Sequence, residues 1–204
     1  MAAVPVLDIL FCTKARTVLL RRLARESLPL SARRLAELSG LTHRAVIAAL
    51  EPLVEEGIVN KRTAGPAYQY SLQREHAAVE TVLLPVLAAE DLLPGLMAGE
   101  LIALFSPVAR SITLYGSAAR GEDVPGSDVD VLVVTSGADE REKVEESAET
   151  ERARFFRRFG RPLSVHCLAQ ADLGEPWPPF VAAAAGEGIL LFGTDLAALR
   201  PDDG

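Results

Sequence analysis

Cysteine is scarce in this 204-residue chain, which contains only Cys12 and Cys167. Two cysteines cannot build a disulfide scaffold or a cysteine-rich zinc site, so we expect a reducing compartment and two small, buried apolar thiols. Long hydrophobic runs are missing too, because uncharged stretches such as 81–89 and 101–109 are only about half a membrane span. No basic region precedes the first apolar run, which argues against a signal peptide. These absences predict a soluble, cytoplasmic protein without a membrane partner.

The charge of the chain is unevenly distributed. Hydrophobic residues make up 49% and charged residues 24% of the sequence, an ordinary globular composition that excludes disorder of the whole chain. The net charge is −7, yet residues 1–75 carry 11 basic and 7 acidic residues, whereas residues 76–204 carry 10 and 21. This asymmetry predicts two modules with different partners. The basic module suits nucleic acid, and the acidic one suits either metal ions or a soluble surface.

The first third of the chain has the pattern of three helices. Apolar residues at helical spacing predict a helix over 14–25. Ser31 is placed to cap a second helix, which Gly40 ends because glycine accepts the left-handed conformation. Thr42 is placed to cap a third helix, which Gly57 stops.

A β-hairpin is predicted next, because the runs 58–62 and 67–72 flank a turn at 64–66. Three helices followed by a hairpin resemble the winged helix-turn-helix of bacterial and archaeal regulators over about residues 8–73. The segments that carry this resemblance are 31–36, 40–46 and 50–59. The resemblance implies binding of double-stranded DNA and a role in transcription regulation.

Candidate DNA-binding residues lie at the helix starts and on the hairpin. In helix-turn-helix proteins the start of the third helix reaches base edges, which suits His43 and Arg44. Lys61 and Arg62 on the hairpin are placed to touch phosphates, although simple solvation also explains each of these side chains. The full candidate set is Ser31, Thr42, His43, Arg44, Lys61 and Arg62.

Residues 75–107 are rich in leucine and alanine and are expected to form two or three helices broken by Pro85 and Pro94. A connector of this kind is usually core or dimer interface, so we expect a homodimer. The predicted domains are therefore a winged helix-turn-helix over 1–74, a helical linker over 75–107 and a third segment over 108–204.

Strands and helices alternate in the third segment. The predicted strands are 110–115, 129–135, 162–168 and 189–192, and the predicted helices are 139–159 and 177–186. The expected buried stripe of the first helix consists of Val144, Ala148, Phe155, Phe156 and Phe159. The basic residues near its end are expected to pair with acidic residues of the same helix; they are Arg152, Arg154, Arg157, Arg158 and Arg161.

Two short motifs in this segment suit phosphate and metal chemistry. Gly116 and Ser117 follow a predicted strand, where backbone N–H groups and a hydroxyl can approach phosphate oxygens. Gly121 allows the chain to turn. Asp128 and Asp130 alternate on the next strand and so share a face, where two carboxylates repel each other unless a cation such as Mg²⁺ or Mn²⁺ neutralises them.

The segments 114–121 and 127–133 resemble the nucleotidyltransferase signature of the DNA polymerase β superfamily, in its minimal MNT-type form. The order of modules also resembles prokaryotic DNA-binding nucleotidyltransferases. The implied fold class is α/β (α+β), an N-terminal winged helix-turn-helix followed by a mixed sheet flanked by helices. The implied nucleotide-binding residues are Gly116, Ser117, Arg120 and Ser127, with Arg120 expected mainly to brace the acidic pair. Asp128 and Asp130 would be catalytic residues that bind Mg²⁺ or Mn²⁺ while ATP or another NTP is attacked at its α-phosphate.

The sequence departs from this resemblance at one position. Active members of the superfamily have a third carboxylate on a later strand, whereas strand 161–168 places Ser164 and His166 on the matching face. Asp172 follows the strand, farther along than the expected position, and is the alternative source of a third carboxylate. His166 could act as a catalytic base or a metal ligand, or could simply sit on a half-buried strand.

Three functions fit these observations. The first is a DNA-binding, antitoxin-like nucleotidyltransferase that transfers AMP from ATP to a partner protein, for which the resemblance implies a HEPN-type toxin. The second is a transcription regulator whose degenerate nucleotidyltransferase domain senses a nucleotide or shapes a dimer. The third, an enzyme that modifies a small molecule such as an antibiotic, is disfavoured by the winged helix.

Overall fold

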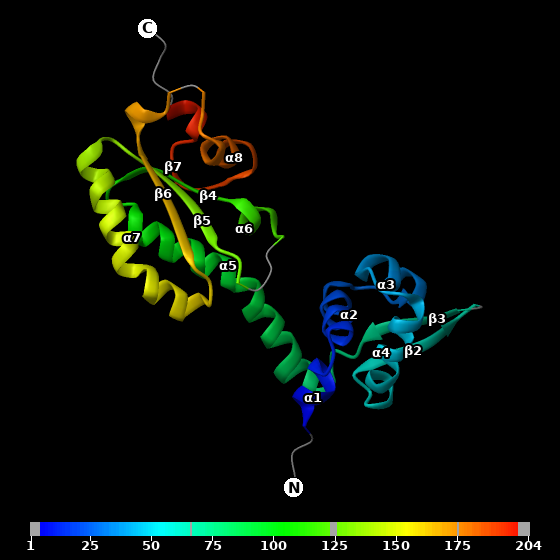
Figure 1. The fold of residues 1–204 in the computed structure, drawn as a ribbon. Coiled ribbons are helices and arrows are strands. Elements are labelled where there is room, and N and C mark those ends of the chain that lie inside the picture. The colour runs from blue at the N-terminus through cyan, green and yellow to red at the C-terminus, as the bar shows by residue number, and fades with distance from the viewer. Residues whose placement is uncertain (1–4, 66, 123–125, 175, 200–204) are drawn as a thin grey trace. The chain divides into compact units, whose positions relative to one another are not determined.

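The computed structural model describes residues 5–65, 67–122, 126–174 and 176–199. The chain forms two compact units, Met1–Leu93 and Pro94–Gly204, and each is described by itself (Figure 1). The division falls inside the segment 75–107 that was expected to link the modules. The predicted turn at 64–66 includes Pro66, which lies outside the described residues.

The first unit contains the expected three helices and hairpin. Its elements are α1 (Val6–Phe11), α2 (Lys14–Arg25), β1 (Leu30–Ser31), α3 (Ala32–Ser39), α4 (His43–Glu55), β2 (Val59–Ala64), β3 (Ala67–Leu72), the π-helical turn η1 (Val79–Leu83) and the start of α5 (Leu84–Phe105). The two hairpin strands pair antiparallel, and β1 adds to β3, so the sheet order is β1-β3-β2. Neither α1 nor β1 was expected from the sequence.

Side-chain caps explain where the helices of this unit begin. The Ser31 hydroxyl accepts a hydrogen bond from the Arg34 N–H, and the Thr42 hydroxyl accepts one from the Ala45 N–H, both at 3.2 Å. Gly40 ends α3 with φ of 66°. The predicted caps and stop are thereby confirmed.

The core of the first unit is aliphatic. Its fully buried side chains include Leu10, Leu19, Leu23, Leu35, Val46, Leu50 and Leu53, which come from all four of the helices α1–α4. Cys12, just after α1, is exposed, so its predicted burial is wrong. Helix α1 buries Leu10 and leaves the residue at its C-terminal end in solvent.

The expected breaks at Pro85 and Pro94 are also wrong. Residues Val79–Phe105 form one helix of 27 residues, since the π-helical turn leads directly into α5. A proline removes one backbone hydrogen bond without necessarily ending a helix, and Pro94 lies inside α5. By length and composition alone this helix could cross a membrane, contrary to the expectation that no such helix exists.

The second unit contains a mixed four-stranded sheet with helices on both faces (Figure 1). Its elements after α5 are β4 (Ala109–Tyr115), α6 (Gly116–Arg120), β5 (Val129–Thr135), α7 (Ala138–Phe159), β6 (Leu163–Ala169), η2 (Gln170–Asp172), α8 (Pro179–Glu187), β7 (Ile189–Gly193) and η3 (Leu196–Leu199). The sheet order is β6-β5-β4-β7, with β5 and β6 parallel and the other pairs antiparallel. The predicted α/β fold class is confirmed.

Alternation along β5 separates two cores. Val131 and Val133 pack with residues of α5 and α7 on one face, whereas Leu132 and Val134 pack with residues of α8 and η3 on the other. The predicted stripe of α7 is confirmed except at Phe156, which is 52% exposed. Adjacent helix residues point about 100° apart, so the buried Phe155 turns Phe156 towards solvent.

Candidate functional site

The turn between β4 and α6 brings a glycine against a carboxylate. Gly116 has φ of +73°, and a Cβ at this position would lie 2.6 Å from Oδ2 of Asp130. Both the left-handed backbone and the close approach of the carboxylate therefore require glycine here. Gly121 ends α6 with φ of 67°, but nothing lies near its missing side chain.

The two aspartates differ in exposure. Asp128 immediately precedes β5 and is exposed, whereas Asp130 is the second residue of β5 and is half-buried. The strand register places Tyr115 of β4 opposite Asp130 on one side and Ser164 of β6 on the other. These three side chains share one face of the sheet, the face that α8 covers.

Arg161 holds the segment that leads into β5. Its guanidinium donates from Nε to the Ser127 carbonyl and from Nη2 to the Asp128 carbonyl, both at 3.1 Å. Arg161 was expected to pair within the preceding helix, but α7 ends at Phe159, so that expectation is wrong. It is correct for Arg152 and Arg154, which pair with acidic residues of α7, but Arg154 also contacts Glu100 of α5, and Arg158 pairs with Glu100 instead of a residue of its own helix.

Arg120 does not brace the acidic pair. Its guanidinium pairs instead with Glu122 at 2.7 Å and with Glu187 of α8 at 2.9 Å. Hydrogen bonds to these two carboxylates raise the pKa of Arg120. The expected contact with Asp128 and Asp130 is wrong, because the packing of α8 brings Glu187, 67 residues later in the chain, to the Arg120 guanidinium.

The position beside Asp130 where a third carboxylate was sought is occupied by serine. The parallel register pairs Asp130 with Ser164, and Leu132 with His166. Asp172 lies beyond the other end of β6 in η2, where its carboxylate is 3.9 Å from the guanidinium of Arg141. Across the described ranges of the chain, no three His, Cys, Asp or Glu residues are grouped to hold a metal ion.

His166 belongs to a small cluster of rings. Its Nδ1 lies 2.7 Å from the Tyr115 hydroxyl, and its ring stacks on Phe180 with centroids 4.6 Å apart and planes 23° apart. Burial, with a smaller contribution from the charge of Asp130, raises the pKa of Tyr115 to about 12. Sequence reasoning missed Tyr115 and Phe180, although the position of Tyr115 directly before Gly116 was an available signal.

The donor set determines what the site can hold. Carboxylate oxygens are the ligands that Mg²⁺ and Mn²⁺ prefer, and Asp128 and Asp130 offer them from positions two residues apart. Because Ser164 stands where a third carboxylate was sought, a divalent ion held here would need further ligands from elsewhere, such as the phosphates of a nucleotide.

The candidate DNA-binding residues all lie in the first unit. His43 and Arg44 are exposed in the first turn of α4. Lys61 and Arg62 are exposed on β2, where the Lys61 ammonium lies 4.3 Å from the centre of the Tyr68 ring. Ser31 and Thr42 act as the helix caps described above, so their hydroxyls already accept backbone hydrogen bonds.

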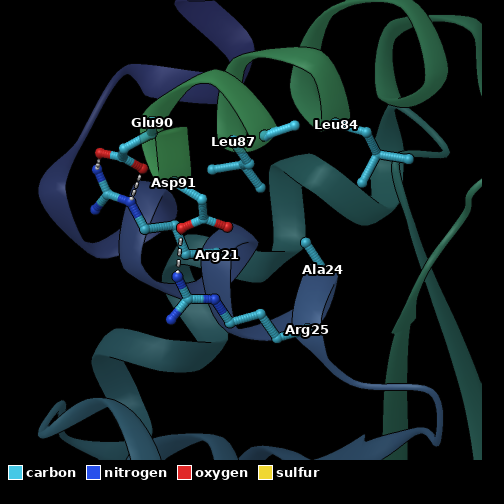
Figure 2. Close-up of a pocket in the computed structure, with 8 residues that line it drawn as sticks. Arg21, Ala24, Arg25, Leu84, Leu87, Glu90 and Asp91 are labelled. Carbon is cyan, nitrogen blue, oxygen red and sulfur yellow. Dashed lines mark hydrogen bonds and ion pairs between the residues drawn. The ribbon is translucent and has the colours of Figure 1, made fainter. Parts of the chain in front are cut away.

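A pocket between α2 and α5 is lined by ion pairs (Figure 2). Arg21 forms a two-pronged pair with Glu90 at 2.6 and 2.7 Å, and Arg25 contacts Asp91 at 2.9 Å. Hydrogen bonding lowers the pKa of Glu90 and raises that of Arg21. These charged groups are paired with one another, so the ion pairs join α2 to α5.

Comparisons with solved structures found partial similarities, three of which follow. An ArsR family transcriptional regulator is 22% identical, over 46% of this chain and 95% of its own, with a TM-score of 0.33. A toxin-antitoxin structure with AMP-PNP is 16% identical over 50% and 77%, with a TM-score of 0.34. A candidate nucleotidyltransferase from Sulfolobus solfataricus is 22% identical over 48% and 75%, with a TM-score of 0.25.

A comparison with curated proteins gave no match. A family model described as "Nucleotidyltransferase domain" matches residues 98–185. This range includes Gly116, Asp128, Asp130, Ser164 and His166. The part of the chain that carries the candidate site is thus the part that matches the nucleotidyltransferase domain family.

Proposed function

We propose that this chain binds a nucleoside triphosphate with one divalent cation at Gly116, Ser117, Asp128 and Asp130, and transfers the nucleotidyl group slowly to a hydroxyl of a partner protein. The observation that carries this proposal is the packing of the Asp130 carboxylate on the backbone of Gly116. That contact puts a cation ligand beside a backbone turn that phosphate oxygens can approach. The match of residues 98–185 to the nucleotidyltransferase domain supports the same chemistry.

Each residue has a role in this proposal. Asp128 and Asp130 hold Mg²⁺ or Mn²⁺, and Arg161 fixes the backbone from which Asp128 projects. A bound cation supplies charge neutralisation at the phosphates while an acceptor hydroxyl attacks the α-phosphate and pyrophosphate leaves. The backbone at Gly116 and the Ser117 hydroxyl orient the triphosphate.

Slow turnover follows from Ser164. The neighbour of Asp130 on β6 is a neutral hydroxyl, which neither adds an anionic ligand for a second ion nor accepts a proton readily at neutral pH. The same observation favours a second candidate function, a regulator that binds nucleotide in this domain without transferring it.

The first unit is proposed to bind double-stranded DNA. Exposed His43 and Arg44 open α4, and exposed Lys61 and Arg62 lie on the hairpin, an arrangement that suits base edges and phosphates respectively. For the two units together we propose a DNA-binding, antitoxin-like nucleotidyltransferase that acts as a homodimer, with a HEPN-type toxin as the partner protein.

Transfer is tested with ATP labelled at the α-phosphate. The full chain is incubated with Mg²⁺ or Mn²⁺ and a candidate HEPN-type partner, and the proteins are separated to find label. We expect weak, metal-dependent labelling of the partner that disappears in Asp130→Asn. Metal-dependent ATP binding without any labelled protein would reject transfer and leave the nucleotide-binding regulator.

A further inference from the structure

The His166 ring is held by two neighbouring aromatic side chains, Tyr115 and Phe180. Tyr115 is 6% exposed, and its hydroxyl meets Nδ1 of His166 at 2.7 Å. Phe180, in the first turn of α8, stacks on the His166 ring, with the two ring centroids 4.6 Å apart. The imidazole is therefore fixed both by a hydrogen bond and by a stacked ring.

The hydrogen bond can be formed in two ways. In one, the Tyr115 O–H donates to Nδ1, and the neutral imidazole carries its proton on Nε2. In the other, Nδ1–H donates to the tyrosine oxygen, and the tyrosine proton needs another acceptor. Tyr115 is 6% exposed, and His166 is the hydrogen-bond partner of its hydroxyl among the described residues, so the second arrangement leaves the tyrosine proton without an acceptor among those residues. An unsatisfied buried donor is costly, and the first arrangement avoids it.

The charges around the site favour a hydrogen-bond donor such as an Nε2–H group. The side chains of Asp128 and Asp130 are anionic, and so is a triphosphate. Arg120 is committed to Glu122 and Glu187, while Arg161 donates to backbone carbonyls. His166 lies on the same face of the sheet as Asp130, two residues beyond Ser164. A neutral donor on this face suits phosphate oxygens, which only accept hydrogen bonds.

We propose that Tyr115 donates to Nδ1 of His166, which keeps the imidazole as its Nε2–H tautomer and makes His166 a hydrogen-bond donor to a phosphate oxygen of the bound nucleotide. This inference rests on the proposed nucleotide binding and goes beyond it. It assigns Tyr115 as a positioning residue. In this tautomer the nitrogen that faces away from Tyr115 carries a proton, so His166 acts as a donor and not as a substitute metal ligand or base.

Imidazole ¹⁵N–¹H correlation spectra of the full chain at neutral pH test the tautomer directly. His43 and His76 are the other histidines, so the signals of His166 are those missing from His166→Gln. We expect Nε2 to be protonated and Nδ1 unprotonated, and we expect Tyr115→Phe to give a mixture of tautomers. A predominant Nδ1–H form in the wild-type chain would overturn the proposal without touching the proposed function.

A calorimetric titration with ATP and Mg²⁺ tests the phosphate contact. Glutamine places an amide donor near the position of Nε2, whereas asparagine places one near Nδ1. We expect His166→Gln to keep wild-type affinity within about threefold, and His166→Ala and His166→Asn to bind about tenfold more weakly. Equal affinity of all four proteins would overturn the phosphate role. Absence of ATP binding by the wild-type chain would overturn the proposed function and the phosphate role with it.

Discussion

Asp130 and Ser164 are direct neighbours on the parallel strands β5 and β6, with their side chains on one face of the sheet. Strand neighbours lie about 5 Å apart, which is the reach over which two carboxylates share a metal site. The register thus identifies Ser164, rather than His166 or Asp172, as the position at which a third carboxylate would complete the acidic group. Asp172 is separated from Asp130 by the whole length of β6.

Introducing a carboxylate at that position is predicted to raise turnover. Ser164→Asp should increase Mg²⁺-dependent nucleotidyl transfer by at least about tenfold, because a third anionic ligand holds a second ion. The rate of label transfer from ATP measures the effect. His166→Asp is the matched control, since it adds the same charge two residues along β6, beside Leu132. A larger gain in His166→Asp than in Ser164→Asp would contradict the register argument.

Gly116 is predicted to be required for ATP binding because its missing side chain leaves room for the Asp130 carboxylate. Gly116→Ala adds a Cβ that would lie 2.6 Å from the Asp130 carboxylate, so it should displace that carboxylate and abolish metal-dependent ATP binding. Gly121→Ala imposes similar strain of about 1 kcal/mol at a left-handed position, but it meets nothing within 4 Å. We expect Gly121→Ala to lower the melting temperature and keep ATP binding. Equal ATP affinity in the two variants would show that the Asp130 contact is unimportant.

The two thiols are predicted to differ strongly in reactivity. Burial raises the pKa of Cys167 to about 12, with a smaller contribution from Glu145. At pH 8 the thiolate fraction of Cys167 is then about one part in ten thousand. Because the thiolate is the reactive form, the labelling rate should rise with pH up to the raised pKa. Cys12 is exposed.

Iodoacetamide labelling followed by mass spectrometry checks this difference. Cys167→Ser should keep rapid labelling at pH 8, whereas Cys12→Ser, which retains the half-buried Cys167, should label far more slowly until denaturant is added. Fast labelling of native Cys12→Ser would show that Cys167 is not protected as the structure places it.

Arg44 and Lys61 are predicted to contribute differently to DNA binding. Arg44→Ala should cost about 1–3 kcal/mol on a specific site and relax sequence preference, whereas Lys61→Ala should weaken all sequences and lower the salt slope by about 1. Mobility shifts of the full chain on DNA from its own upstream region measure both effects. Lys14→Ala removes an exposed charge outside α4 and the hairpin, and it should change little. A loss of affinity in Lys14→Ala as large as that in Arg44→Ala would show that Arg44 contributes only its charge and does not read a base.

Local signals account for what the sequence predicted well. Ser31 and Thr42 cap their helices through hydrogen bonds to residues only three positions away, and β5 is a nearly continuous β-branched run. The contacts that were predicted wrongly or missed join residues far apart in the sequence. Arg120 is drawn to Glu187, and Tyr115 meets His166 51 residues later. Neither contact follows from spacing, because each requires the pairing of strands and the packing of α8.

Calorimetric titration with ATP and Mg²⁺ measures whether Asp128 and Asp130 bind a nucleotide through a divalent cation. We expect saturable, metal-dependent binding by the wild-type chain and none by the double variant Asp128→Asn, Asp130→Asn. Asp172→Asn also removes a carboxylate, but at the far end of β6, and it should bind as the wild type does. Unchanged metal-dependent binding in the double variant would show that Asp128 and Asp130 do not hold the cation.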